Sequence, residues 1–260
     1  ALAGEEVRWT EQSKQFDLQI QRLTGDCALA SSFVSYLGPF NKEFRDLLLS
    51  RDFYGDCVER GIPVTENLDV TRFLVDESEI GEWNLQGLPT DELSIQNGIM
   101  VTRATRYPVL VDPQGQGTAW IKSREEMNML RVTSLGEKQF RNHLEDCMSF
   151  GRPLLIENIE EELDPILDPI LEKLIAVKGK NMTITLSDGK EVDFSESFAL
   201  FCTTRLPNPH YSPELCAKTT VIDFTVTMTG LEDQLLGKLI LKEKQELQTQ
   251  RQALVEEVTS

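Results

Sequence analysis

Short apolar runs alternate along this chain with longer amphipathic segments, and this alternation constrains the fold more than any other feature. Runs of strand length lie at 108–111, 130–133, 153–156, 198–202 and 221–226. Continuous apolar strands that alternate with helices are typical of a parallel sheet covered on both faces. The sequence therefore predicts an α/β fold in which helices lie on both sides of a parallel sheet.

The segments between these runs predict the remaining elements. Gly38-Pro39 ends a first long helix, and Gly61-Ile62-Pro63 ends a second that starts at Phe40. Residues 62–90 are expected to be loops with a short helix after Leu68. Further helices are predicted at 92–105 (capped by Asp91), 137–150, 163–177 and from Leu231 nearly to the end, and a β-hairpin at 182–194.

Both terminal helices carry heptad-like apolar stripes. Trp9, Phe16, Leu23 and Ala30 recur every seven residues, and the last helix repeats apolar residues at spacings of four and seven. Such stripes are typical of coiled-coil seams. We therefore expect long coiled-coil-like helices to flank the α/β core.

Charge and cysteine content exclude several function classes. The formal net charge of -17 argues against a nucleic-acid or anionic-membrane surface. No stretch approaches the roughly 20 apolar residues that span a bilayer. Five scattered cysteines without a CxxC pair argue against a zinc site and favour reduced thiols in the cytosol.

A loop in the position of a phosphate-binding P-loop follows the run at 108–111. A P-loop reads GxxxxGK[ST], with backbone N–H groups around the phosphates, Lys on the terminal phosphates and Ser/Thr on Mg²⁺. The corresponding residues are Asp112, Pro113, Gln114, Gly115, Gln116, Gly117, Thr118 and Ala119. Taken alone, this segment is equally compatible with a simple Gly-rich turn.

Three of the four defining P-loop positions are altered. Thr118 supplies no cation, Ala119 supplies no oxygen for a metal, and Asp112 adds an anion where an anion should bind. Lys122 lies one turn into the following helix, and we expect it to be too far away to substitute. The sequence thus predicts a nucleotide site without its chemistry.

A second altered element ends the run at 153–156. ATPases normally place Asp-Glu there, the Asp for Mg²⁺ and the Glu for the attacking water. Here the residues are Glu157 and Asn158, and an amide cannot serve as a base. The acidic residues from Glu157 to Asp164 could also collect a divalent ion, although a solvated helix N-terminus explains them as well.

Longer strings resemble a known family. The segment Arg106–Gln116, RYPVLVDPQGQ, is similar to the corresponding segment of dynein heavy chains. Further resembling segments are Gly4–Trp9, Tyr36–Phe40, Thr203–Tyr211, Val221–Thr227 and Gly230–Leu236. The similarity covers essentially the whole chain and points to the fifth AAA+ module of an axonemal motor ring, of outer-arm type.

The resemblance implies a domain plan. Residues 1–37 would be the returning stalk helix, 38–229 a three-layer αβα AAA+ large subdomain, and 230–260 the start of the small subdomain leading to the buttress. Thr203 and Thr204 fall near the sensor position. Lys218 falls where an arginine finger is expected, and Lys lacks the two-pronged geometry of Arg.

The resemblance also implies a function. We expect a mechanical module that relays movement between ring and stalk, with no catalytic residue, metal or bound cofactor of its own. ATP and Mg²⁺ would act in other modules of the parent motor. Its partners would be neighbouring modules, stalk and buttress, while the parent would bind microtubules and intermediate and light chains in a ciliary or flagellar axoneme. An active ATPase module and a passive nucleotide holder remain the alternatives.

Overall fold

The computed structural model describes residues 2–179, 181–226, 228, 230–232, 235–236 and 239. The chain divides into two compact units between Val75 and Asp76. The predicted helix from Leu231 onward, with the small-subdomain start at 230–260, falls almost wholly outside the described residues. In the described part of the chain, no helix combines the length and apolar character needed to cross a bilayer.

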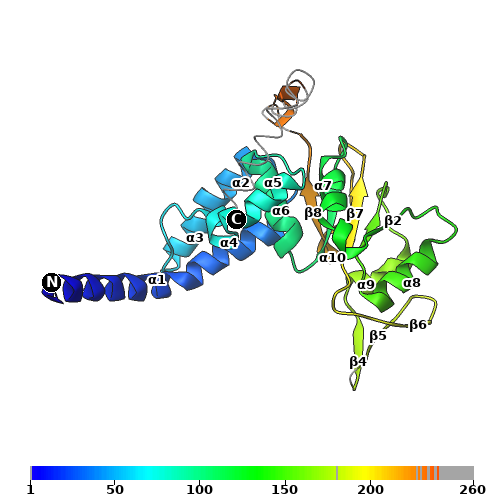
Figure 1. Cartoon of the computed structure of the whole chain (residues 1–260), viewed down its shortest axis with the longest axis horizontal. Coiled ribbons are helices and arrows are strands. Elements are labelled where there is room, and N and C mark those ends of the chain that lie inside the picture. The colour runs from blue at the N-terminus through cyan, green and yellow to red at the C-terminus, as the bar shows by residue number, and fades with distance from the viewer. Residues whose placement is uncertain are drawn as a thin grey trace. The chain divides into compact units, whose positions relative to one another are not determined.

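The first unit is helical (Figure 1). As expected, its first helix ends just before Gly38-Pro39, and a short helix follows Leu68. The predicted second helix contains a π-helical stretch between two α-helical ones. The elements are α1 (Leu2–Tyr36), α2 (Lys42–Leu47), η1 (Leu48–Phe53), α3 (Tyr54–Glu59) and α4 (Val70–Leu74).

The second unit is built on a five-stranded sheet in the order β2-β3-β7-β1-β8, and every pairing in it is parallel. This confirms the predicted parallel sheet. Its strands are β1 (Tyr107–Val111), β2 (Arg131–Thr133), β3 (Leu154–Ile156), β7 (Leu200–Thr204) and β8 (Thr219–Asp223). Strand β7 begins two residues later than predicted and follows a turn in which the Phe198 N–H donates to the Ser195 carbonyl at 3.0 Å.

Helices cover both faces of this sheet, which gives the expected three-layer αβα architecture. Successive strand residues point to opposite faces. Val109 packs with residues of α8, α9 and α10 in one core, whereas Leu110 approaches Gly117 on α7. The helices of this unit are α5 (Glu77–Leu85), α6 (Glu92–Arg103), α7 (Gln116–Arg124), α8 (Phe140–Phe150), α9 (Asp168–Leu171) and α10 (Pro213–Lys218), with short 3₁₀ turns at Glu126–Asn128 and Pro165–Leu167.

Aromatic packing joins the helices of the second layer. Trp120 on α7 is fully buried, meets Trp83 on α5 edge-on at 5.8 Å between ring centroids, and stacks on Phe224 at 6.5 Å. Helix α6 begins at the predicted cap, since Asp91 accepts a hydrogen bond from the Ser94 N–H at 3.1 Å. Helix α5, which the sequence left as loop, is held by the burial of Trp83.

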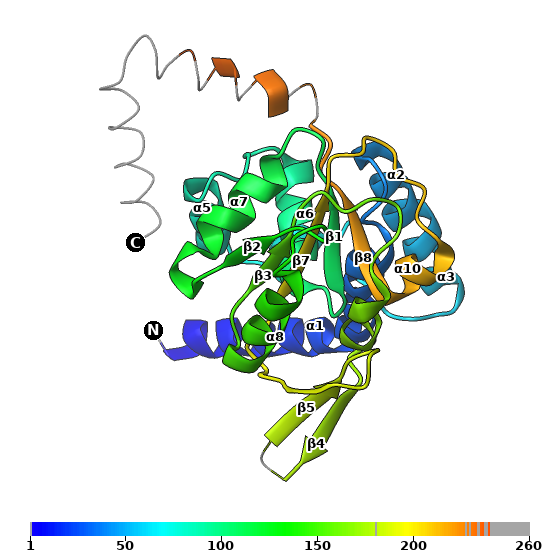
Figure 2. The same cartoon turned by 90° about the vertical axis from the view of Figure 1, so that its right-hand side faces the viewer.

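The predicted helix at 163–177 is wrong in its second half. Helix α9 stops at Leu171, Lys173 takes a left-handed conformation (φ 53°), and residues 175–178 form a strand. The β-branched and apolar residues Ile175 to Val177 favour a strand once a neighbour is available. That neighbour is the predicted hairpin, so β4 (Ile175–Lys178), β5 (Asn181–Thr185) and β6 (Glu191–Asp193) form an antiparallel sheet, which projects from the second unit in Figure 2.

Candidate functional site

The three segments singled out from the sequence meet at one edge of the five-stranded sheet. Strands β3, β7 and β1 are adjacent and parallel, so their carboxyl ends lie side by side. The segment from Asp112 follows β1, Glu157 follows β3, and Thr203 and Thr204 end β7. In open α/β sheets this edge is where ligands bind.

Asp112 closes the loop after β1 from the inside. Its side chain is 1% exposed, and its backbone N–H donates to the Thr204 carbonyl at 2.9 Å. One carboxylate oxygen accepts the Gln116 N–H at 2.8 Å; the other accepts the Thr118 N–H and the Thr118 hydroxyl, both at 2.7 Å. The carboxylate thus satisfies N–H groups in the first turn of α7, which otherwise lack partners within the helix.

The two glycines of the loop serve different needs. Gly115 takes a left-handed conformation (φ 78°), which favours glycine, and a Cβ there would meet no atom within 4 Å. At Gly117 a Cβ would lie 2.8 Å from Leu110 and 2.9 Å from Phe224. Gly117 is therefore required by the contact between α7 and the sheet.

The remaining residues of the segment differ in exposure. Gln114 and Ala119 are exposed, whereas Pro113, Gln116 and Thr118 are half-buried. Ala119 continues the helix through its N–H, which donates to the Gly115 carbonyl at 3.0 Å. The structure thus brings Asp112, Gln116 and Thr118 together and leaves Gln114 and Ala119 at the surface.

Lys122 is paired with Glu157. Its Nζ lies 2.7 Å from Glu157 Oε1, and the Glu157 N–H donates to the Thr133 carbonyl at 2.9 Å, which aligns this residue with the end of β2. Asn158 is exposed and left-handed (φ 56°). The ammonium one turn into α7 therefore reaches the end of β3.

The hydroxyl of Thr204 is used within the protein. It donates to the Ile159 carbonyl at 2.7 Å and accepts the Leu206 N–H at 3.2 Å. Thr203 is buried, and its carbonyl accepts the Ile159 N–H at 3.0 Å. Both residues of the sensor-like pair thus tie the end of β7 to the loop after β3.

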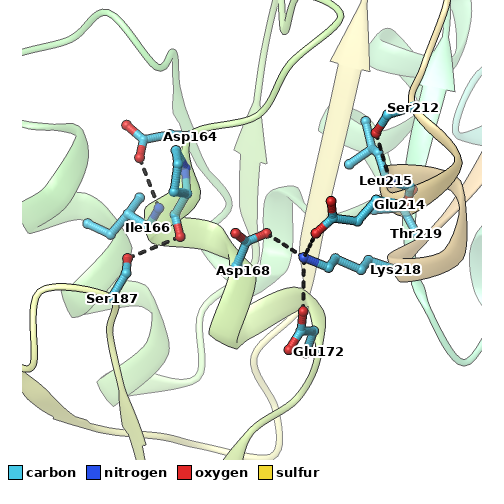
Figure 3. A network of polar contacts seen from close by, with 11 residues as sticks. Asp164, Ile166, Asp168, Glu172, Ser187, Ser212, Glu214, Leu215, Lys218 and Thr219 are labelled. Carbon is cyan, nitrogen blue, oxygen red and sulfur yellow. Dashed lines mark hydrogen bonds and ion pairs between the residues drawn. The ribbon is translucent and has the colours of Figure 1, made fainter.

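Lys218 stands at the centre of a group of carboxylates, as Figure 3 shows. Its Nζ lies 2.7 Å from Glu214, 2.9 Å from Glu172 and 3.0 Å from Asp168. Hydrogen bonds to Glu214, Glu172 and Asp168 raise the pKa of Lys218 above its usual range. The residue at the expected arginine-finger position therefore links α10 to α9 of the same unit.

The acidic residues after β3 make separate contacts. Asp164 caps the 3₁₀ turn by accepting the Ile166 N–H at 2.9 Å, and Glu161 accepts the His210 N–H at 3.0 Å. Within the described residues, no three His, Cys, Asp or Glu side chains gather in an arrangement that could hold a metal ion.

Sequence reasoning identified the segments but not the contacts between them, and two ion pairs illustrate the difference. The Glu214–Lys218 spacing of i, i+4 was a local signal for an ion pair on one helix. The pairing of Lys122 with Glu157 had no such signal, because these residues belong to different elements, 35 positions apart, that only the sheet brings together.

Comparison with known proteins agrees with this architecture. A protein-family model described as "ATP-binding dynein motor region" matches residues 81–260, and one described as "Microtubule-binding stalk of dynein motor" matches residues 1–55.

Individual relatives are similar over the whole chain. It is 75% identical over 260 residues to the "Dynein gamma chain, flagellar outer arm" of Chlamydomonas reinhardtii, covering 100% of this chain and 6% of that protein. It is 58% identical to mouse "Dynein axonemal heavy chain 5" over 259 residues and to human "Dynein axonemal heavy chain 8" over 258, covering 100% and 99% of this chain and 6% of each relative. Since one family model spans more than half of its residues, the chain belongs to the dynein motor region family.

Proposed function

We propose that this chain is a mechanical AAA+ module of an axonemal, outer-arm-type dynein heavy chain, the fifth of its ring. In this proposal it relays movement between neighbouring modules and the stalk and neither binds nor hydrolyses ATP. The parent motor would use ATP in other modules, bind microtubules and carry intermediate and light chains. The similarity to flagellar outer-arm and axonemal chains supports this assignment.

The observation that carries the proposal is the position of the Asp112 carboxylate. In a P-loop, backbone N–H groups at the start of the helix hold the nucleotide phosphates. Here the N–H groups of Gln116 and Thr118 are bound to Asp112. A phosphate would have to displace this buried anion or lie beside it, and both are unfavourable at low dielectric.

The other residues do not fit Mg-ATP either. Thr118 provides no cation, and its hydroxyl is donated to Asp112. Lys122 is paired with Glu157, so this pairing also occupies the carboxylate at the end of β3. Because Thr204 donates to Ile159, a sensor contact would require that bond to break.

Two features favour the alternative of a passive nucleotide holder. Gly115 keeps the left-handed turn that opens α7, and the matching family is described as ATP-binding. In that alternative the module would retain a nucleotide as a structural ligand without turning it over.

Titration calorimetry with Mg-ATP and Mg-ADP distinguishes the mechanical module from the passive nucleotide holder. We expect no binding at micromolar concentrations by the 260-residue chain, and micromolar affinity would contradict the proposal. Turnover abolished by Asn158→Ala would establish an active ATPase instead.

A pair of variants tests the part played by Asp112. The double variant Thr118→Lys/Ala119→Thr restores a cation and a metal ligand but keeps the internal anion, so we expect no tight ATP binding. Adding Asp112→Gly restores all four consensus positions and is expected to produce binding. Micromolar affinity in the double variant, or none in the triple variant, would show that Asp112 is not the decisive obstacle.

A further inference from the structure

Helix α1 changes character at Gly25. Before this residue its large apolar side chains are exposed: Trp9 by 68%, Phe16 by 62% and Ile20 by 66%. After it one face of the helix is buried, with Leu29, Ala30 and Phe33 at 2–3% exposure, while Tyr36 remains exposed. In Figure 1 the N-terminal part of α1 accordingly extends beyond the other helices of the first unit.

The boundary coincides with a close approach of α1 to another segment. A Cβ at Gly25 would lie 2.3 Å from the Pro63 carbonyl oxygen and 2.9 Å from the Val64 Cβ. A backbone oxygen cannot move aside as a flexible side chain would. Glycine weakens a helix interior relative to alanine, so its presence here reflects direct contact between the helix and the 61–65 loop.

The next residue bonds to the same loop. Asp26 is 6% exposed; one of its carboxylate oxygens accepts the Thr65 N–H at 2.7 Å, and the other accepts the Thr65 hydroxyl at 2.7 Å. Two short hydrogen bonds to a buried carboxylate fix both the distance and the orientation of Asp26 relative to Thr65. Sliding α1 by even one residue would carry this charge away from its partners and leave it buried without them.

A second attachment holds the other end of the buried half. Arg45 on α2 is 1% exposed, and its guanidinium donates to the carbonyls of Leu37 at 3.0 Å, Gly38 at 2.9 Å and Phe40 at 2.8 Å. These carbonyls follow the last turn of α1, where the helix dipole favours a cation. The segment 25–40 is therefore held at both ends.

We propose that Gly25 and Asp26 act with Thr65 as a clamp that fixes the axial position of α1. Together with the Arg45 attachment, the clamp prevents α1 from sliding or turning against residues 42–75. A displacement of the exposed half of α1 then moves the first unit as a rigid body. This deepens the proposed mechanical relay and depends on it for its biological purpose.

Distance measurement between two spin labels tests the clamp in the 260-residue chain. Labels at Gln19→Cys and Glu59→Cys, both at exposed positions, report on α1 before the clamp and on the end of α3, with the exposed Cys27 and Cys216 changed to Ser. We expect a narrow distance distribution with the clamp intact and one at least about twice as wide in Asp26→Ala. Asp17→Ala, an exposed aspartate on the same helix, is the matched control and should leave the distribution unchanged.

Changes at Thr65 separate the clamp from general stability. Thr65→Val removes the hydroxyl but keeps the N–H, and we expect intermediate broadening even if Asp26→Ala does not fold. Thr65→Ser keeps both donors and should retain the narrow distribution. An unchanged width in Thr65→Val, or in a folded Asp26→Ala, would overturn the clamp. Micromolar ATP binding would contradict the proposed function, but it would not affect the conclusion about the clamp.

Discussion

At the scale of single residues, the polar groups at the carboxyl edge of the sheet are bonded to one another. Asp112 accepts the N–H groups of α7, Thr204 donates to the loop after β3, and Lys122 is paired with Glu157. Groups that would face a ligand in a nucleotide site thus contribute to the fold itself. Removing one of these contacts should therefore lower the free energy of unfolding.

Asp112→Ala should lower the free energy of unfolding by about 2–3 kcal/mol, because two N–H groups and a hydroxyl lose a buried charged acceptor. Formate or inorganic phosphate at high millimolar concentration should raise the Tm of the variant more than that of the parent chain. Urea unfolding and thermal melts measure both effects. Asp76→Ala is the control, since Asp76 is exposed and makes no side-chain cap bond; an equal loss there would refute the prediction.

Gly117→Ala should destabilise the chain by about 1–3 kcal/mol through overpacking. The added methyl would press on Leu110 and Phe224, which are buried between the sheet and α7. Gly136→Ala, where a Cβ meets nothing within 4 Å, should change stability by less than about 0.5 kcal/mol. Equal midpoints for the two variants in urea unfolding would contradict the packing role of Gly117.

At the scale of elements, ion pairs attach the small antiparallel sheet to the larger core. Arg141 and Glu145 on α8 pair with Asp188 and Lys190 in the β5–β6 turn. The Lys190 ammonium, followed by Arg141, holds the pKa of Glu145 below its usual range. Apolar residues of β5 and β6, Ile184 and Val192, join the core beneath these pairs.

Glu145→Gln should therefore reduce stability in a pH-dependent way. A carboxyl whose folded pKa is depressed stabilises the protein above its unfolded pKa of about 4.3, and this contribution is lost as pH falls through the folded value. The difference in unfolding free energy between parent and variant should be full at pH 7 and shrink below about pH 4. The neighbouring exposed Asp146→Asn is the control. A difference that stays constant with pH would rule out the charge of Glu145 as the cause.

At the scale of the whole molecule, charge limits what the chain can bind. The formal net charge is -17, and the chain spans 6% of the length of its first relatives. What the isolated chain binds is therefore expected from its own surface and not from the activities of a complete motor. An acidic surface is repelled by other acidic polymers at low salt and is screened at higher salt.

The isolated chain is accordingly expected to stay in the supernatant when microtubules, whose surface is acidic, are sedimented at physiological ionic strength. Chain spun without microtubules controls for self-association through the exposed apolar residues of α1. Saturable pelleting with microtubules would contradict the electrostatic argument.

The sequence by itself determined the layer architecture, most strands and the segments of the candidate site. Continuous apolar runs predict buried parallel strands, and the residues at Asp112, Thr118, Ala119 and Asn158 carry their chemistry locally. Local pattern could not predict β4, because its residues 175–178 continue a helical pattern and become a strand only beside β5.

Only the tertiary structure decided which polar groups meet. Asp26 with Thr65, Lys122 with Glu157, and Lys218 with Asp168 and Glu172 each join elements that are distant in sequence. Such pairs have no periodicity, since their partners are set by sheet order and helix crossing. The sequence showed that Asp112 places an anion in the loop after β1. The fold decided that this anion is buried and bonds to the start of α7, because the turn at Gly115 brings the N–H groups of Gln116 and Thr118 to its carboxylate.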